Sequence, residues 1–200
     1  MIGVIDYGLG NMFSLANALN YIKAEFRTVA TPEDSLGLSG LILPGVGAFP
    51  EGMRKLALSG IDTLLKQYKK PILGICLGMQ LLFEESEEFG LTDGLSLIPG
   101  RVIKIQNAPK IPHMGWNELT INFPTTLTGK LPDKSQVYFV HSYKAVTDQQ
   151  YLAASSDYYE DITAIACRGN VYGTQFHPEK SGDAGIIMLK NFIQLCEVQQ

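Results

Sequence analysis

The sequence has few basic residues, and they form no cluster. Among 200 residues there are 16 Lys and Arg against 20 Asp and Glu, which gives a formal net charge of −4 at pH 7. A nucleic-acid-binding surface needs clustered Lys and Arg to contact the phosphates. We therefore expect no nucleic-acid partner.

Long apolar runs are also missing. The apolar segments are broken by Gly and Pro, as in LGLSGLILPGVGAFP, or are too short to cross a bilayer. The N-terminal stretch MIGVIDYG has neither a basic region nor a site typical of signal-peptide cleavage. We expect no membrane association and a cytoplasmic location.

Cysteine is scarce, with three residues in the chain, Cys76, Cys167 and Cys196. They are widely spaced and form no C-x-x-C pair, so neither a disulfide framework nor a zinc site is indicated. Cys167 and Cys196 lie in apolar segments, which is typical of small buried side chains. The phosphate-binding G-x-G-x-x-G and Walker patterns are absent too. We expect neither a metal nor a cofactor.

The first half of the sequence alternates short apolar runs with helical patterns. The runs at 2–6, 25–30, 40–45 and 71–75 are typical of buried parallel strands. Helices are predicted between them, with the following bounds: 11–22, 54–70 and 77–88. This alternation indicates a largely parallel sheet covered by helices.

The second half has a different character. Short β runs separated by Pro, Gly, Asn and Asp occupy residues 100–175, and a last helix is predicted over 184–198. The runs are typical of antiparallel pairs, which we expect to extend the same sheet. With no linker or repeat, the chain is predicted to be a single three-layer α/β domain, with helices on both faces of the sheet and added antiparallel strands.

The segment PILGICLGMQLLF places Cys76 between Gly74 and Gly78 as G-x-C-x-G, where a strand meets a helix. A sharp strand-to-helix turn exposes its central residue, as in the G-x-S-x-G nucleophile elbow. The start of the helix would lower the thiol pKa and offer N–H donors to an oxyanion. The pentapeptide alone fits a small buried cysteine equally well.

An attacking thiolate needs a base, and the chain has three histidines, His113, His141 and His177. His177 has the most suggestive context, because a β run ends just before it and Pro178 favours extended backbone at it. Glu179 falls on the same side of an extended segment and could orient the imidazole. A polar strand end with a solvated glutamate is the alternative.

A glycine-rich loop follows the strand at 40–45. Its residues Gly45, Val46 and Gly47 can bring a backbone N–H close to a reacting carbonyl, and the N–H of Leu77 would be the partner donor of an oxyanion hole. Phosphate binding is the competing interpretation, and neither phosphate-binding pattern supports it.

The segments GICLGMQLLF, LPGVGAF and QFHPEKS occur in this order. Together they resemble the class I, triad-type glutamine amidotransferases, which hydrolyse the side-chain amide of glutamine through a γ-glutamyl thioester and pass the ammonia to a synthase. The resemblance implies that Cys76 is the nucleophile, His177 the general base and acid, and Glu179 the residue that orients His177. It implies one glutamine amidotransferase domain over residues 1–200.

The same resemblance implies residues that hold glutamine. Gln80 and the backbone around Ser142 and Tyr143 would bind its amino-acid end, with Gly45 beside them. The glutaminase subunit of another amidotransferase is one alternative. A hydrolase on the same scaffold, such as a peptidase or γ-glutamyl hydrolase, would not need Gln80 or the WN motif and would act without a partner. A non-catalytic regulatory module is a further alternative, which the intact Cys76, His177 and Glu179 disfavour.

Other segments narrow the resemblance: IDYGLGN, ESEEFG, LSLIPGRV, PHMGWN and FVHSY. They are similar to the family members that act in histidine biosynthesis, where a separate cyclase with a (β/α)8 barrel uses the ammonia and forms a heterodimer with the glutaminase. Asn11, Trp116 and Lys180 match positions at or near that interface. Each also has a simpler interpretation, as a helix-start residue, a core aromatic and a surface charge respectively.

Overall fold

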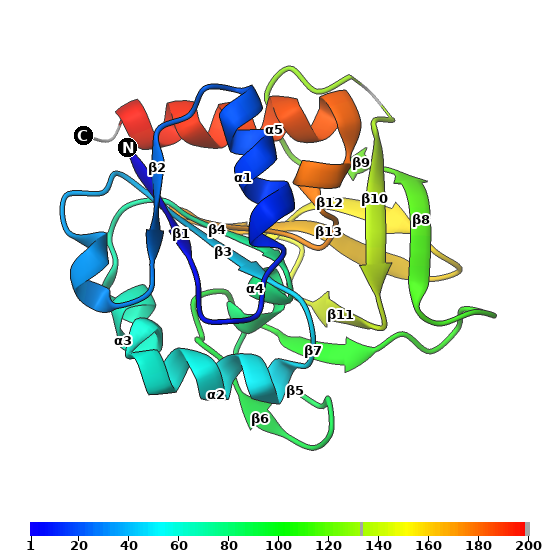
Figure 1. The fold of residues 1–200 in the computed structure, drawn as a ribbon. Coiled ribbons are helices and arrows are strands. Elements are labelled where there is room, and N and C mark those ends of the chain that lie inside the picture. Colours follow the sequence, from blue (N-terminus) through cyan, green and yellow to red (C-terminus); the bar gives the residue numbers. More distant parts are fainter. Residues whose placement is uncertain (133, 199–200) are drawn as a thin grey trace.

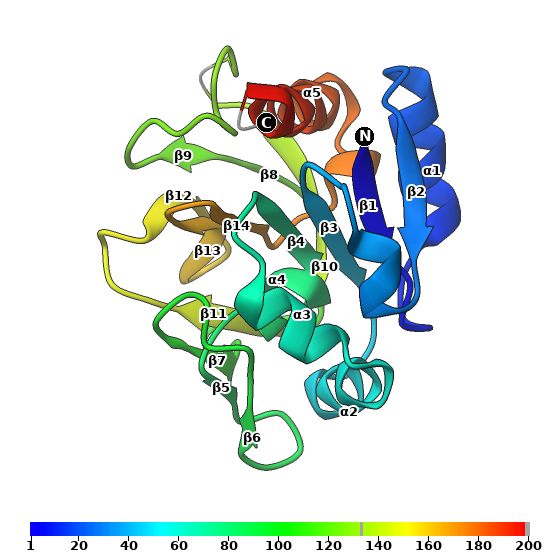
Figure 2. The same cartoon turned by 90° about the vertical axis from the view of Figure 1, so that its left-hand side faces the viewer.

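The computed structural model describes residues 1–132 and 134–198 of the chain. Its central sheet has the strand order β2-β1-β3-β4-β14-β13-β12-β9 (Figures 1 and 2). The parallel strands are β1 (Ile2–Ile5), β2 (Phe26–Val29), β3 (Leu41–Gly45), β4 (Ile72–Cys76) and β14 (Val171–Thr174). Antiparallel pairs add β13 (Asp161–Arg168), β12 (Leu152–Asp157) and β9 (Thr120–Ile121).

Helices cover both faces of this sheet (Figure 1). One face carries α1 (Met12–Tyr21) and α5 (Gly182–Val198), which share a core cluster with residues of β1 and β14. The other carries α2 (Phe49–Ser59), α3 (Ile61–Gln67) and α4 (Leu77–Leu81). Short 3-10 helices are η1 (Pro32–Ser35) and η2 (Pro178–Lys180). The predicted three-layer α/β fold with a largely parallel sheet is confirmed.

Two smaller sheets lie beside the main one, so the prediction that all later strands extend one sheet is wrong. β8 (His113–Glu118) pairs with β10 (Gln136–His141). The other sheet contains β11 (Tyr143–Val146), β7 (Arg101–Lys104), β5 (Glu85–Ser86) and β6 (Thr92–Asp93). β8 alternates inward-facing and exposed residues. A strand with one solvated face suits a peripheral ribbon better than a sheet covered by helices on both sides.

The helix after Cys76 is shorter than predicted, because α4 ends at Leu81 instead of Glu88. Carbonyl groups that a longer helix would use are bonded to a later segment instead: the N–H groups of Leu95 and Leu97 donate to the carbonyl oxygens of Leu81 and Leu82. The EESEE stretch that follows would also place like charges at the negative end of a longer helix. Tertiary hydrogen bonds and charge therefore end this helix early.

The helical stretch predicted over 54–70 is two helices. Gly60 lies between α2 and α3 with a φ of 72°, a left-handed conformation that ends a helix readily when the residue is glycine. α2 also starts before the predicted bound, at Phe49. The prediction is right in type and wrong in its boundaries.

Candidate active site

The carboxyl ends of three neighbouring strands meet at one edge of the main sheet. β4 lies between β3 and β14. β4 ends at Cys76, β3 leads into Val46 and Gly47, and β14 leads to His177. The ends of parallel strands are a common place for a binding site.

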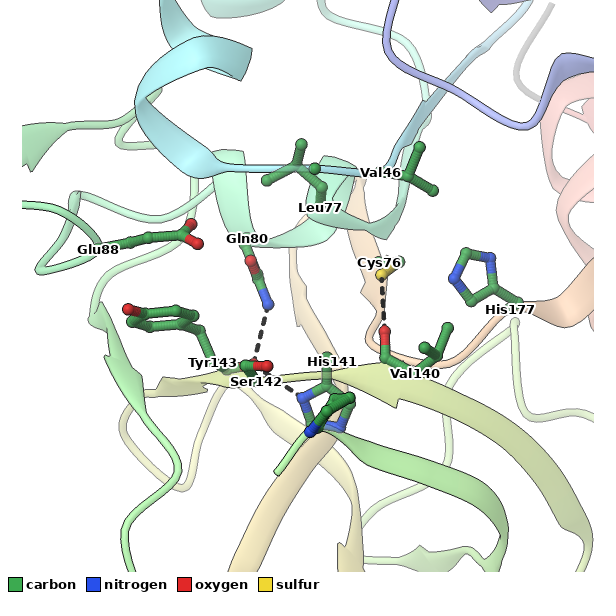
Figure 3. A pocket seen from close by; sticks show the side chains of 12 residues that line it. Val46, Cys76, Leu77, Gln80, Glu88, Val140, His141, Ser142, Tyr143 and His177 are labelled. Carbon is green, nitrogen blue, oxygen red and sulfur yellow. Dashed lines mark hydrogen bonds between the residues drawn. The ribbon is translucent and has the colours of Figure 1, made fainter. Parts of the chain in front are cut away.

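A cavity of about 330 Å³ opens at this edge (Figure 3). Its opposite wall comes from the junction of β10 and β11 (Figure 3), so residues from the main sheet and from both smaller sheets enclose it. The residues that line it are Val46, Gly47, Cys76, Leu77, Gln80, Glu88, Pro112, Val140, His141, Ser142, Tyr143 and His177.

Cys76 has an unusual backbone conformation, with a φ of 54° and a ψ of −110°. Such a conformation costs a non-glycine residue about 1–3 kcal/mol and persists only where the surroundings impose it. The flanking glycines show how they do so. A Cβ on Gly74 would lie 2.6 Å from the carbonyl oxygen of Gly78, and a Cβ on Gly78 would lie 1.8 Å from that of Leu43. The predicted elbow is present, and both glycines are required by its packing.

The thiol of Cys76 faces the cavity and has polar neighbours on two sides. Its Sγ lies 3.8 Å from the carbonyl oxygen of Val140 and 3.8 Å from Nε2 of Gln175, which donates to it. The hydroxyl of Tyr7 is buried and interacts electrostatically with Cys76. Burial is the larger cause and this interaction the smaller cause of the raised pKa of Tyr7. Cys76 is therefore placed for chemistry and is not surrounded by apolar groups alone.

His177 and Glu179 form a buried pair beside the thiol. Nδ1 of His177 is 2.8 Å from Oε1 of Glu179, and each side chain is 3% exposed. The imidazole faces Cys76 across the cavity (Figure 3). Burial lowers the pKa of His177, but Cys76 and Glu179 outweigh it and raise that pKa to about 10. Nε2 of His177 has no hydrogen-bond partner among the described residues, so it is open to a proton from the thiol or from a substrate.

The glycine-rich loop borders the cavity through Val46 and Gly47, while Gly45 lies behind it and does not line it. A Cβ on Gly45 would lie 2.5 Å from the hydroxyl oxygen of Tyr7 and 2.8 Å from the backbone nitrogen of Gly78. Gly45 therefore has a packing role, and its expected contact with the substrate stays a prediction. Gly47 has a φ of 108°, which side-chain-bearing residues rarely adopt.

The far end of the cavity is polar. Nε2 of Gln80 donates to the carbonyl oxygen of Tyr143 at 2.9 Å and to Oε1 of Gln175 at 3.0 Å. Both amide hydrogens of Gln80 are thus engaged, and its oxygen remains as an acceptor. The buried carboxylate of Glu88 enters the cavity and accepts from the N–H of Phe49 at 2.7 Å (Figure 3). Two oxygen acceptors therefore face this end of the site.

Three residues of the site lie outside the sequence-based prediction. Glu88 sits in an acidic run that is typical of a solvated surface, and the early end of α4 turns it inward. Gln175 precedes His177 by two residues, and its contact with Cys76 needs the tertiary fold. His141 was predicted no role, and it lines the cavity. Residue type and spacing carry little signal for any of them.

The three residues expected at a partner interface lie in different surroundings. Asn11 accepts from the N–H of Ser14 at 3.2 Å and caps α1, as the helix-start interpretation predicts. Trp116 is 53% exposed on β8, so the core-aromatic interpretation is wrong. Lys180 is exposed on η2.

Residues 1–132 and 134–198 contain neither a candidate metal site nor a membrane-spanning helix. No group of three or more His, Cys, Asp or Glu residues there could hold a metal ion. Within the same ranges, no helix has the length and apolar character needed to span a membrane.

Comparison with known proteins identifies the family. The model of the glutamine amidotransferase class-I family matches residues 3–195. The chain is 45% identical over 207 residues to the imidazole glycerol phosphate synthase subunit HisH of Geobacillus sp. strain WCH70, covering 98% of each. It is 48% identical over 206 residues to that of Shouchella clausii strain KSM-K16, covering 98% of this chain and 99% of the relative. A solved glutamine amidotransferase structure, 19% identical, matches the fold with a TM-score of 0.78 over 98% of this chain and 100% of that chain. The chain belongs to the class I glutamine amidotransferases, a family of enzymes.

Proposed function

We propose that this chain is the glutaminase subunit of imidazole glycerol phosphate synthase. It hydrolyses glutamine to glutamate and ammonia and supplies the ammonia to a cyclase subunit. The cyclase forms imidazole glycerol phosphate and aminoimidazole carboxamide ribotide. The observation that carries the proposal is a thiol at a strained elbow, coupled to a buried His–Glu pair, in a chain similar over nearly its full length to relatives of that name. Those names favour this function over a γ-glutamyl hydrolase or peptidase.

The first chemical step is attack on the glutamine side chain. His177 takes the proton of the Cys76 thiol, and the thiolate forms a carbon–sulfur bond to the amide carbonyl. Glu179 holds the Nδ1–H of His177, so that Nε2 faces the sulfur, and stabilises the imidazolium. The pKa of His177, raised despite burial, favours this charged state of the ring.

The second half of the reaction returns the enzyme to its starting state. His177 donates its proton to the departing nitrogen as the carbon–nitrogen bond breaks, which releases ammonia and leaves a thioester. His177 then takes a proton from water, whose oxygen attacks the thioester carbonyl. The carbon–sulfur bond breaks, and glutamate and the Cys76 thiol result.

The negative oxygen formed in each attack needs donors. The N–H of Leu77, the first residue of α4, and an N–H of the loop at Val46 or Gly47 are the candidates, since all three residues line the cavity beside Cys76. Losing one such donor costs roughly 10²–10³ in rate. A peptide flip in this loop could therefore silence the free subunit and prevent wasteful glutamine hydrolysis.

The polar end of the cavity suits the amino-acid end of glutamine. The Glu88 carboxylate and the free amide oxygen of Gln80 can accept from the α-ammonium group. The backbone at Ser142 and Tyr143 forms the facing wall and can hold the α-carboxylate (Figure 3). This places the side-chain amide toward Cys76.

The partner we propose is a separate cyclase with a (β/α)8 barrel, forming a heterodimer. Free ammonia would be lost by protonation and diffusion, so a closed interface over the active site is chemically sensible. Met114 and Trp116 are exposed on β8, and Tyr138 lies opposite Trp116 on β10. This apolar strip begins next to Val140, which lines the cavity. Lys180 and Asn11 are the further contacts expected from the sequence.

Glutamine hydrolysis, measured as glutamate formed, tests the proposal. We expect slow turnover by the chain alone and strong stimulation by the cyclase subunit with its nucleotide ligand, with Cys76→Ala inactive in both cases. Full turnover without a partner would contradict the switch. Hydrolysis of γ-glutamyl peptides in preference to glutamine would favour the γ-glutamyl hydrolase alternative.

A further inference from the structure

Two buried histidines lie against the wall of the glutamine pocket. Nδ1 of His113 is 3.0 Å from Nε2 of His141, and Nδ1 of His141 is 2.8 Å from the carbonyl oxygen of Tyr143. On the other side, Nε2 of His113 is 2.9 Å from Oδ1 of Asn117, whose Nδ2 donates to the carbonyl oxygen of Asp157 at 2.8 Å. The result is an unbroken chain of polar contacts from Tyr143 to Asp157.

This chain of contacts has one hydrogen too few. The backbone carbonyl of Asp157 can only accept, so the Asn117 amide must donate to it and turn its oxygen toward His113. The backbone carbonyl of Tyr143 can also only accept. Three links therefore need a ring hydrogen: Tyr143 to His141, His141 to His113, and His113 to Asn117. Two neutral imidazoles carry one each.

An additional proton would complete the chain, and the surroundings oppose it. The titratable groups that face the pair are His177, near His141, and Tyr158, whose ring stacks on His113 at 3.8 Å between centroids. No carboxylate of the described residues forms a hydrogen bond or ion pair with either ring. Burial lowers the pKa of both histidines, that of His141 to about 3. In the neutral pair, one of the three links is open at any moment.

The two ends of this chain lie at functionally different places. The Tyr143 carbonyl also accepts from Gln80, so this end belongs to the wall that holds glutamine. Asn117 lies on β8, whose outward-facing side exposes Met114 and Trp116. The pair thus connects the glutamine pocket to the ribbon that carries the apolar strip.

We propose that His141, supported by His113, is a positioning residue that holds the Tyr143 carbonyl for glutamine binding, and that Asn117 weakens this hold by competing for the two ring hydrogens. The inference rests on the proposed function and deepens it. Whenever the Asn117 oxygen accepts a hydrogen bond from Nε2 of His113, one of the two inner links, Tyr143 to His141 or His141 to His113, has no hydrogen. Without the Asn117 oxygen, both rings can carry their hydrogen on Nδ1, and both inner links close.

Two measurements on the purified chain test this. Nitrogen NMR of histidine-labelled protein reads the tautomer of each ring. Calorimetry measures the Kd for glutamine in a Cys76→Ala background, where no turnover occurs. We expect Asn117→Ala to shift both rings to the Nδ1–H tautomer and to lower the Kd about twofold. His141→Phe should raise the Kd about tenfold, the size of one lost hydrogen bond.

The double variant separates positioning from a merely structural role. If Asn117 acts through His141, then Asn117→Ala has no effect on the Kd once His141 is Phe. Tyr158→Phe is the matched control, since it keeps the ring stacked on His113 and loses only the hydroxyl contact to Lys110, and it should change neither readout.

Opposite results would overturn the proposal. A rise in Kd for Asn117→Ala, or tautomers unchanged by it, contradicts the competition for hydrogens. Absence of glutamine binding by the Cys76→Ala chain would contradict the proposed function and the positioning role together. The tautomer shift would then still show whether the histidine chain is one hydrogen short.

Discussion

Cys76 keeps a strained conformation because the residues around it leave no other. The strain of about 1–3 kcal/mol is offset by close packing: only glycine fits at 74, where β4 approaches the backbone of α4, and at 78, where α4 approaches β3. The catalytic role we propose for the thiol therefore depends on backbone packing as much as on its pKa. Both glycines are open to direct test.

Gly78→Ala should destabilise the fold by about 3 kcal/mol, because its Cβ would meet a backbone oxygen that cannot move aside cheaply. That oxygen, of Leu43, lies 1.8 Å from the position of the added carbon. Urea unfolding measures the loss. Gly129→Ala is the control, with its nearest contact at 3.3 Å, and we expect it to cost under about 1 kcal/mol. Equal losses in the two variants would show that the close approach is not limiting.

Glu179→Gln should make the stability of the protein depend differently on pH. The pKa of His177 is raised from 6.5 to about 10, so its protonated form stabilises the fold fully below pH 6.5, and this contribution is lost as the pH rises through about 10. Without the Glu179 carboxylate, which helps to raise it, the pKa of His177 in the folded protein is lower. The advantage of the wild type in free energy of unfolding should therefore shrink between pH 6.5 and 10.

Urea unfolding at several pH values across that window measures the difference. Glu25→Gln, at an exposed glutamate, should show a difference from wild type that stays constant with pH. A wild-type advantage over Glu179→Gln that grows with pH would contradict the raised pKa of His177.

At the scale of elements, the sequence predicts what local pattern determines. The strand–turn–helix at Cys76 and the strand before His177 follow from apolar runs, glycines and proline. The end of α4 at Leu81 does not, because it depends on hydrogen bonds from residues 95–98. Glu88 reaches the pocket only through that early end, so its place in the site could not be read from the acidic run around it.

The β8–β10 ribbon shows the same limit in another way. The histidines at 113 and 141 are far apart in sequence, and their contact depends on the pairing of His113 opposite His141 in this ribbon. An exposed tryptophan on β8 likewise needs the ribbon to stand apart from the main sheet. Nothing local distinguishes such a residue from a core aromatic.

Trp116→Ala should weaken binding of the cyclase subunit about 30-fold, which corresponds to the loss of an aromatic anchor worth about 2 kcal/mol. Its side chain is half exposed, so the melting temperature of the free chain should change little. Titration calorimetry with the cyclase gives the Kd. Tyr21→Ala, at the opposite end of α1 from Asn11 and 76% exposed, serves as the control and should bind normally. Unchanged affinity for Trp116→Ala would show that Trp116 is not an anchor of the interface.

At the scale of the molecule, the two walls of the cavity come from different sheets. Cys76 ends β4 and His177 follows β14 of the main sheet, whereas Ser142 and Tyr143 lie where β10 of the ribbon passes into β11 of the four-stranded sheet. The proposed partner, bound to the ribbon, would therefore act on the glutamine wall and also on Cys76, whose thiol lies 3.8 Å from the carbonyl oxygen of Val140 on β10. The parallel sheet and its two core clusters, by contrast, follow from the periodic apolar pattern and are predictable from the sequence.

The proposed division of labour between this chain and a cyclase subunit predicts how the complex responds to loss of the thiol. Cys76→Ala removes the nucleophile and shortens one side chain of the core cluster around α1 and α5, while the other core cluster and the apolar strip keep all their residues. The complex should form normally and lose glutamine-dependent synthesis of imidazole glycerol phosphate. With ammonium salts in place of glutamine, synthesis should continue near the wild-type rate, because free ammonia reaches the cyclase without the thioester. Loss of both activities, with the complex still formed, would mean that Cys76 acts in the cyclase reaction and not only in the release of ammonia.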